Sequence, residues 1–172
     1  KIKFLKIREP GGSINAEKIR KLILNNKSNF NKNTDLLLYL ASRSENIEII
    51  KKNMGMRVIL IDRFVDSTVA YQHYGMGVSM KIINIINHLL LGKIKVNFTF
   101  LNLVDKKNML QRLSKRKKLN RYDKFKNLFY SRVQKGFIKI SNKNPKKYLR
   151  INSNLDLTIN KKLIISKIKQ LI

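Results

Sequence analysis

A short apolar strand followed at once by two opposite charges constrains this chain more than any other feature. Residues 58–61 (VILI) predict a buried strand, and Asp62 and Arg63 follow it directly, before a predicted helix over 66–74. In open α/β sheets, ligands bind at the carboxyl ends of the strands, which is where this pair falls. Arg63 offers a fixed cation for a phosphate, and Asp62 offers an anion for a metal ion or an attacking hydroxyl. The pair therefore predicts half of a phosphoryl-transfer site.

Strands and helices alternate along the chain, which predicts a parallel sheet with helices on both faces. The expected strands, all compatible with one sheet, are 2–7, 57–61, 96–103 and 148–151. The expected helices are 15–24, 34–52, 66–74, 79–91, 105–116, 121–141 and 155–172. Thr34 is expected to cap the second helix. The core-facing residues of that helix are expected to be Leu37, Leu40, Ile47 and Ile50. We expect one α/β domain over residues 1–172.

The net charge of +28 suggests a nucleic-acid partner, but the composition favours another explanation. The chain has 28 Lys, 10 Arg and 20 Asn, and it is rich in Ile. Lys, Asn and Ile share A/T-rich codons, and the lysines are spread over the whole chain. We therefore interpret the charge as a codon-driven, solvated surface, with only weak binding to polyanions at low salt. No specific nucleic-acid partner is predicted.

The composition also bounds the compartment. The chain contains no cysteine, which excludes disulfides and thiolate metal sites and fits a cytoplasmic protein. Apolar residues make up 43%, as in globular proteins. The longest apolar runs, such as 82–91, fall short of the roughly 18 residues of a membrane span. Residues 1–7 are too charged for a secretory signal, so we expect a cytoplasmic protein without membrane association.

Two further segments carry residues suited to a phosphorylated ligand. Arg8 leaves the first strand at the same edge as Asp62, and Gly11 and Gly12 would let backbone N–H groups approach a ligand. The alternative is an ordinary strand-to-helix turn with an exposed arginine. Tyr39 and Arg43 lie four residues apart on one helix face, where they could stack on a base and bond its edge. The alternative is a core tyrosine and a surface arginine.

A basic run connects two expected helices. Six of the ten residues from 112 to 121 are cations, and three of the six are arginines. The run reads either as a solvated charge cluster or as a mobile lid, about 113–122, that closes on a nucleotide polyphosphate. Arginine suits bidentate phosphate contacts better than lysine does, which favours the lid.

Taken together, these segments resemble the bacterial thymidylate kinases. The matching pieces occur in the family's order: REPGGS, LLLYLASR, VILIDRFVDSTVAYQ, and the RLSKRKKLNRYD run. The resemblance covers nearly the whole chain. It implies a three-layer α/β/α P-loop kinase fold that transfers the γ-phosphoryl group of ATP to dTMP with Mg²⁺. It also implies a homodimer.

The resemblance further implies a role for each matching residue. Arg8 and Arg63 would hold the dTMP phosphate, Tyr39 would stack on thymine, and Arg43 would bond the thymine edge. Tyr71 would press on the deoxyribose and disfavour a 2′-hydroxyl. The base and sugar pocket would be lined by Ser67, Thr68 and Gln72.

The remaining implied roles concern the transferred phosphoryl group. Asp62 would act near Mg²⁺ and the accepting phosphate, with Glu9 assisting. The lid arginines that bind ATP would be Arg112, Arg116 and Arg121. The catalytic residues would be Asp62, Arg63, Arg116 and Arg121.

The sequence departs from the family most at its start. A first strand, a Gly-rich phosphate loop with its Lys and Ser/Thr, and a first helix are absent from the 172 residues. That strand is central in the fold, so we expect a gap in the sheet. The resemblance thus implies an N-terminally truncated or decayed thymidylate kinase that holds ATP poorly. Two alternatives remain: another nucleotide or deoxynucleoside kinase of this fold, and a non-catalytic basic nucleic-acid-binding protein.

Overall fold

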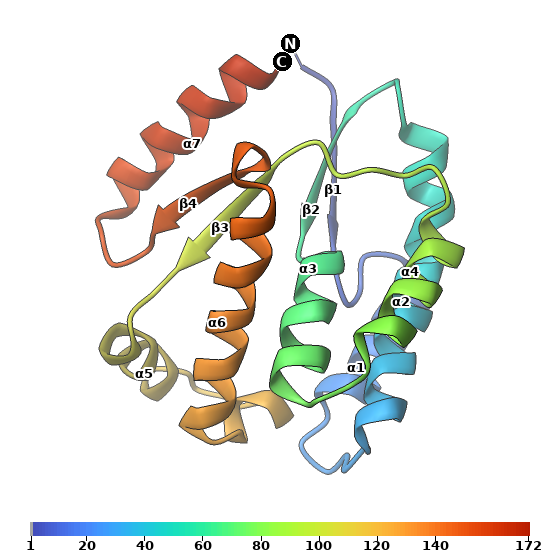
Figure 1. The fold of residues 1–172 in the computed structure, drawn as a ribbon, viewed down its shortest axis with the longest axis vertical. Coiled ribbons are helices and arrows are strands. Elements are labelled where there is room, and N and C mark those ends of the chain that lie inside the picture. Colours follow the sequence, from blue (N-terminus) through green and yellow to red (C-terminus); the bar gives the residue numbers. More distant parts are fainter. Residues whose placement is uncertain (1) are drawn as a thin grey trace. The chain divides into compact units, whose positions relative to one another are not determined.

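The strands of the computed structural model, which describes residues 2–172, pair in parallel (Figure 1). β1 (Phe4–Arg8) pairs with β2 (Val58–Asp62), and β3 (Thr99–Leu103) pairs with β4 (Tyr148–Asn152). This confirms the α/β class and its parallel strands. The expected gap in the sheet is present, because the pairs form two separate two-stranded sheets and no strand of the described residues joins them.

The chain divides into two compact units. The first unit runs to Lys95 and takes in Leu119–Phe137, whereas the second comprises Val96–Lys118 and Ile138–Ile172. The helices of the first unit are α1 (Ile14–Leu24), α2 (Lys32–Asn53), α3 (Val65–Thr68), η1 (Val69–Gly75), α4 (Met80–Leu91) and η2 (Arg121–Lys124). The second unit contains α5 (Lys106–Ser114), η3 (Pro145–Lys147) and α7 (Leu157–Leu171), and α6 (Asn127–Lys143) runs through both. A single domain with a lid at 113–122 stays a prediction.

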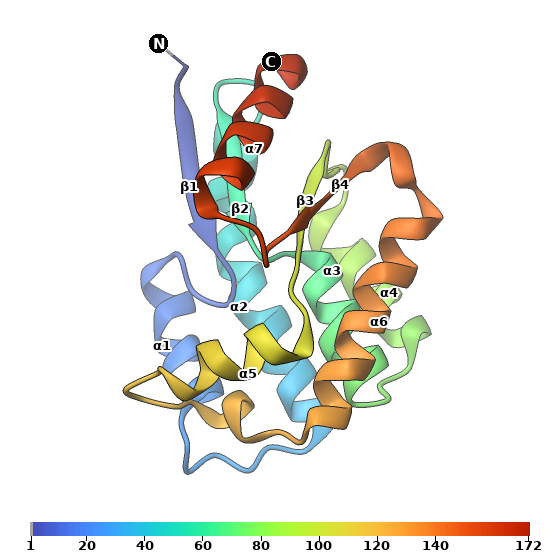
Figure 2. The ribbon, with the colours of Figure 1, turned by 90° about the vertical axis from the view of Figure 1, so that its left-hand side faces the viewer.

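One face of the β1–β2 pair carries one hydrophobic core cluster of the first unit, and a separate cluster joins α2 and α4. Ile7 packs on this sheet face with Ile47 and Ile50 of α2, and all three are buried. Alternate strand residues share a face, so Leu5, Ile59 and Ile61 join the same cluster. β1 and β2 run side by side in both ribbon views (Figure 2). This packing fixes the two strand ends next to each other.

Helix α2 begins earlier than the sequence pattern indicated. Asn31 caps it, with its side chain accepting hydrogen bonds from the backbone N–H groups of Asn33 and Thr34, so Thr34 is not the cap. The buried apolar residues are Leu36, Leu40, Ile47 and Ile50. Leu37 is 58% exposed, contrary to expectation, because a helix turns about 100° per residue and the buried stripe runs through Leu36.

Two other helices differ from expectation in form. The helix expected over 66–74 is one α turn, α3, followed by a π-helix, η1, in which Met76 N–H donates to the Tyr71 carbonyl. The long helix expected over 121–141 is broken. Asn120 and Asp123 form a capping box around the 3₁₀ turn η2, and α6 begins only at Asn127.

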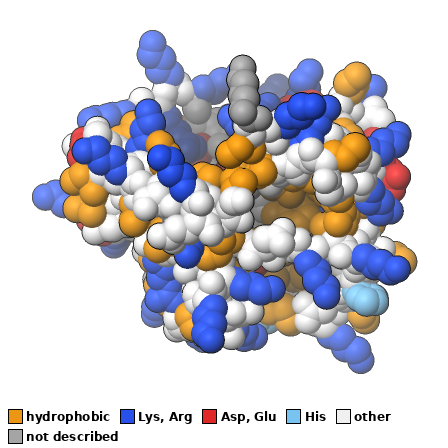
Figure 3. All heavy atoms as spheres, turned by 90° about the horizontal axis from the view of Figure 1, so that it is seen from above, with side chains coloured by type: hydrophobic (Ala, Val, Ile, Leu, Met, Phe, Trp, Pro, Cys, Tyr) orange, Lys and Arg blue, Asp and Glu red, His pale blue; other side chains and the backbone are white. Residues whose placement is uncertain are grey.

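The second unit is built on the β3–β4 pair. Asp105, where a helix was expected to begin, caps α5, and the Arg150 guanidinium of β4 donates to the Ser141 hydroxyl at the end of α6. No helix among residues 2–172 has the length and hydropathy needed to cross a bilayer. On the face shown in Figure 3, Lys and Arg side chains are dispersed among apolar and polar ones and do not form a single stripe.

Candidate functional site

The two strand ends of the first unit bring the predicted charges together. Arg8 and Asp62 are register partners, and the Glu9 N–H donates to the Asp62 carbonyl oxygen at 2.8 Å. The next residue, Arg63, has φ 63°, in the left-handed region that non-glycine residues rarely adopt. Such backbone strain costs on the order of 1–3 kcal/mol and is concentrated at functional sites. The adjacency of the Arg8 and Arg63 strand ends, on which the sequence hypothesis depended, is present.

The Arg63 side chain lies against the π-helix. Its guanidinium stands 5.0 Å from the centre of the Tyr71 ring, and Nη2 is 3.3 Å from the Tyr71 hydroxyl. A π turn rotates side chains relative to an α-helix, which places Tyr71 over the arginine at the strand end. A cation on an aromatic face keeps hydrogen-bond donors at its edge available to an anion.

The loop from Glu9 to Gly12 is fixed by protein groups. The Gly11 N–H donates to the Ser42 hydroxyl at 3.0 Å, and the Gly12 N–H donates to Glu17 at 2.9 Å. The expectation that these N–H groups face a ligand is therefore wrong in this structure. Gly12 has φ 105°, and an added Cβ would stand 3.1 Å from the Arg8 carbonyl oxygen. The glycines shape the turn that holds Arg8.

Arg8 itself is exposed and ion-paired. Its Nε and Nη2 atoms lie 3.1 and 3.0 Å from Glu17 Oε1. The Gly12 N–H, joined by the Arg8 guanidinium, holds the pKa of Glu17 below its ordinary value. Arg20, one helical turn after Glu17, donates to the Pro10 carbonyl oxygen at 2.6 Å. Glu17 thus holds Arg8 at the strand end.

Arg43 lies at the centre of a buried polar network. Only 1% of its surface is exposed, so the alternative of a surface arginine is wrong. Its three nitrogens donate to Glu9 at 2.8 Å, Asn87 at 2.7 Å and Thr68 at 2.9 Å. Burial raises the pKa of Glu9, and the positive charge of Arg43 opposes that shift. The network connects the strand-end loop, α2, α3 and α4. The spacing of Tyr39 and Arg43 in the sequence gave no indication of these connections.

Three tyrosines pack against one another next to Arg63. The Tyr122 ring meets Tyr39 and Tyr71 edge to face, with ring centres 6.1 and 5.9 Å away. Burial raises the pKa of Tyr39 to about 12, so its ring stays neutral at ordinary pH. Sequence reasoning missed Tyr122. The available signal was an aromatic residue directly after the basic run.

A second buried network holds Arg121. Its guanidinium forms an ion pair with Asp35, and its Nε donates to the Ile23 carbonyl oxygen at 3.1 Å. Asp35 also accepts from the Tyr122 hydroxyl at 2.6 Å and from the Gln72 amide at 2.9 Å. Arg121 was expected on a lid, but this structure buries it with protein partners. A role for it at a phosphate stays a prediction.

The comparisons with known proteins agree with this geometry. The family model described as Thymidylate kinase matches residues 1–164. The chain belongs to the thymidylate kinase family. It is 33% identical to a thymidylate kinase of Sulfurihydrogenibium sp., covering 96% of this chain and 82% of that protein, and 35% identical to one of Acholeplasma laidlawii, covering 98% and 85%. A crystal structure of thymidylate kinase from Ehrlichia chaffeensis superposes with a TM-score of 0.75 at 29% identity, covering 96% of this chain and 80% of that one.

The basic run of this thymidylate kinase family member lies mostly in the second unit. Arg112 and Arg116 are exposed, as are the lysines between and after them. Arg112 Nη2 donates to the Ser153 carbonyl oxygen at 2.5 Å. The run thus presents several charged side chains to solvent, and its proposed contact with ATP stays a prediction.

The carboxylates of the site bear on whether it suits Mg²⁺. Asp62 is exposed at the end of β2, whereas Glu9 is buried against Arg43. No cluster of three or more His, Cys, Asp or Glu occurs among residues 2–172. Mg²⁺ is commonly held by one or two carboxylates together with substrate phosphates. The single exposed carboxylate of Asp62 fits that kind of site.

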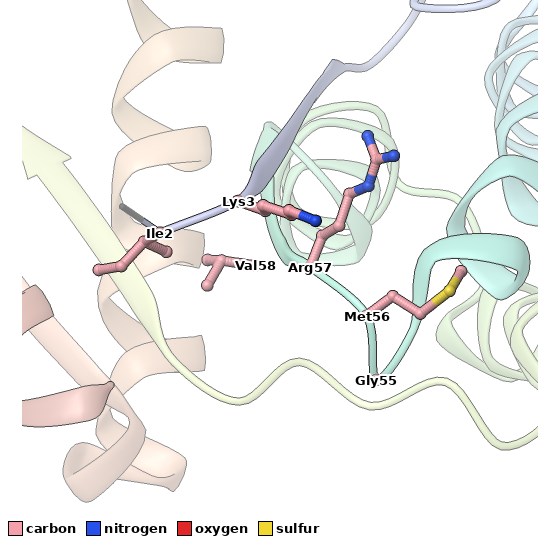
Figure 4. A pocket seen from close by; sticks show the side chains of 6 residues that line it. All are labelled: Ile2, Lys3, Gly55, Met56, Arg57 and Val58. Carbon is pink, nitrogen blue, oxygen red and sulfur yellow. The ribbon is translucent and has the colours of Figure 1, made fainter.

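A separate hollow lies at the other end of the β1–β2 pair. It has a volume of about 450 Å³ and is lined by Ile2, Lys3, Gly55, Met56, Arg57 and Val58 (Figure 4). These residues flank the start of β2, whereas Asp62 ends that strand. The hollow is therefore distinct from the site at the strand ends.

Proposed function

We propose that this protein phosphorylates dTMP to dTDP with ATP, in the supply of dTTP. The observation that carries the proposal is the adjacency of Arg8, Asp62 and Arg63 at two neighbouring strand ends, with Tyr71 against Arg63. A phosphate needs cations at fixed positions, and a pyrimidine needs flat apolar walls. Both occur in the first unit. Family membership supports this choice over other kinases and over a nucleic-acid-binding protein.

We assign the dTMP site by position. Arg8 and Arg63 bind the phosphate, and Tyr39 stacks on thymine. Arg43, whose two Nη atoms each donate one bond to protein, can direct a remaining N–H at the thymine edge. Tyr71 packs on the deoxyribose. The rest of the pocket is lined by Ser67, Thr68 and Gln72.

The reaction relies on positioning and charge neutralisation. The acceptor phosphate is already an anion at neutral pH, so no strong general base is required. Arg63 orients it, and Arg112 and Arg116 neutralise charge on the transferring group. Asp62 would hold Mg²⁺, which supplies further positive charge between the phosphates when it is bound.

The partners and the compartment follow the same proposal. We infer a homodimer, supported by an exposed apolar stripe on α4 that comprises Ile82, Ile85 and Leu89. Analytical ultracentrifugation checks this inference, and a monomer at high protein concentration contradicts it. The absence of cysteine fits a cytoplasmic location, which cell fractionation checks.

Calorimetry with nucleotides tests the substrate assignment. We expect the 172-residue chain to bind dTMP, and Arg63→Ala to weaken that binding about 10- to 100-fold through loss of charge-assisted hydrogen bonds. Arg57→Ala is the matched control, because Arg57 is an exposed arginine just before the same strand. Equal affinities in the two variants would contradict the proposal.

Phosphoryl transfer needs a second experiment. The chain is extended at its amino end by about 30 residues that carry a Walker A loop, and ADP release from Mg·ATP is measured. We expect release that depends on dTMP. Release that is equally fast without dTMP, or that prefers another monophosphate, favours one of the alternatives.

A further inference from the structure

Asp35 receives hydrogen bonds from three side chains of two separate segments. The residue is in the first turn of α2, and none of its surface is exposed. Arg121 and Tyr122 of η2 donate to it, the first as an ion pair and the second at 2.6 Å. Gln72 of η1 donates its side-chain amide at 2.9 Å. The ionised carboxylate only accepts, so every partner must present a donor.

This requirement fixes the orientation of the Gln72 amide. The side chain is fully buried, and its Nε2 points at Asp35. The carbonyl Oε1 at the other end is buried without a hydrogen-bond partner in the described part of the chain. An unsatisfied buried acceptor is costly, and such groups are rare in native proteins. Oε1 is therefore available to a donor that the protein does not supply.

The neighbours of Gln72 place this acceptor beside the base pocket. Tyr71 precedes it and contacts Arg63 and Tyr122, and Thr68, one turn earlier, bonds Arg43. Thymine carries an N–H at N3, which is a donor, whereas the N3 of cytosine is an acceptor. A pocket that presents an acceptor at this edge therefore forms a hydrogen bond with thymine. With cytosine, two acceptors would face each other and no hydrogen bond would form.

We propose that Asp35 is a positioning residue that sets pyrimidine selectivity by holding the Gln72 amide with its carbonyl oxygen toward the base. This inference rests on the proposed function. Asp35 does not touch the nucleotide. Arg121 balances its charge, and Arg121 and Tyr122 keep the carboxylate from turning, so η2, at the end of the basic run, contributes to base choice.

Asp35→Asn tests the proposal because it reverses one hydrogen bond with almost no change in volume. The new amide has one donor end and one acceptor end. Its oxygen can still accept from Arg121, and its NH₂ group then faces Gln72. Gln72 regains a hydrogen bond only by turning its own carbonyl toward that NH₂ group, which directs the Gln72 NH₂ group at the base.

Calorimetric titration with dTMP and dCMP provides the measurement. We expect Asp35→Asn to weaken dTMP binding about 10- to 100-fold and to leave dCMP binding unchanged or stronger. The selectivity ratio then falls by at least about tenfold. Glu48→Gln is the matched control. It makes the same chemical change on the same helix, but at an exposed carboxylate paired with Lys51. Its ratio should equal that of the unmodified protein.

The outcomes separate this inference from the proposed function. Equal losses for both nucleotides in Asp35→Asn mean a purely structural role and overturn the inference. An unmodified protein that does not prefer dTMP contradicts the proposed function itself. If the variant fails to fold, Asp35→Asn is combined with Arg121→Met, which removes both buried charges together. The same fall in the selectivity ratio is expected, and an unchanged ratio again overturns the inference.

Discussion

The two buried polar networks of the first unit and the stretch of the basic run in the second unit hold their arginines in opposite ways. Arg43 and Arg121 are buried, and each is ion-paired with a buried carboxylate, Glu9 and Asp35 respectively. Every residue from Gln111 to Leu119 except Leu113 is exposed. One region fixes its cations before any ligand arrives, whereas the other leaves them at the surface.

This difference matches two different tasks. A pocket that recognises a base must keep donors and acceptors in place, because selectivity depends on fixed partners. Cations that neutralise charge during transfer need to act only when that charge develops. Buried ion pairs are weak evidence for stability, since well-packed apolar residues often serve as well. We therefore interpret the buried pairs as devices for geometry.

The largest expected effect comes from breaking the buried pair. Arg43→Met leaves the Glu9 carboxylate buried without its cation, so we expect a loss of about 3–5 kcal/mol of unfolding free energy. Urea denaturation followed by circular dichroism measures the change. The matched control is Glu17→Gln, which breaks the exposed Arg8 pair and should cost at most about 1 kcal/mol. Similar losses in the two variants would show that burial does not distinguish the pairs.

A smaller effect is expected at the basic run, and it should appear in the rate. In the chain extended with a Walker A segment, Arg116→Ala should lower kcat about 10- to 100-fold, because a cation that neutralises the developing charge is lost. The KM for dTMP should stay the same. Lys117→Ala, at the next exposed cation, should change kcat less than about twofold, because a flexible point charge forms no bidentate contact. A rise in the KM for dTMP without a change in kcat would place Arg116 in substrate binding instead.

The sequence predicted those parts of the structure that local patterns encode. All four strands lie within two residues of their expected ends, apart from the start of β3, which lies three residues later. Apolar runs and the charges that follow them determine such features. The pairing of Arg8 with Asp62 followed from one further rule, that parallel strands end at the same edge.

The rest depended on partners that are distant in the sequence. Arg43 bonds Asn87, 44 positions away, and Arg121 bonds Asp35, 86 positions away. No spacing rule connects such residues. The left-handed Arg63 and the π turn at Tyr71 are likewise set by tertiary packing, which overrides local propensity. The sequence therefore indicated which residues to examine, but not which of them are buried.

The smallest expected effect is the dependence of stability on pH, and its sign is opposite at Glu17 and at Glu9. The Gly12 N–H and Arg8 hold the pKa of Glu17 below the usual 4.5, so Glu17 adds stability above that pH and loses it as the pH falls through its folded value. Burial raises the pKa of Glu9, so ionising Glu9 costs stability as the pH rises from 4.5. In urea denaturation, the fall in unfolding free energy between neutral and acidic pH should therefore be smaller in Glu17→Gln than in the unmodified protein. The difference should be less than about 1 kcal/mol, because the pair is partly exposed. If that fall is unchanged in Glu17→Gln, it comes from other carboxylates, such as the exposed helix caps Asp105 and Asp156. Hydrogen bonds from backbone N–H groups are the main cause that lowers the pKa values of these two residues.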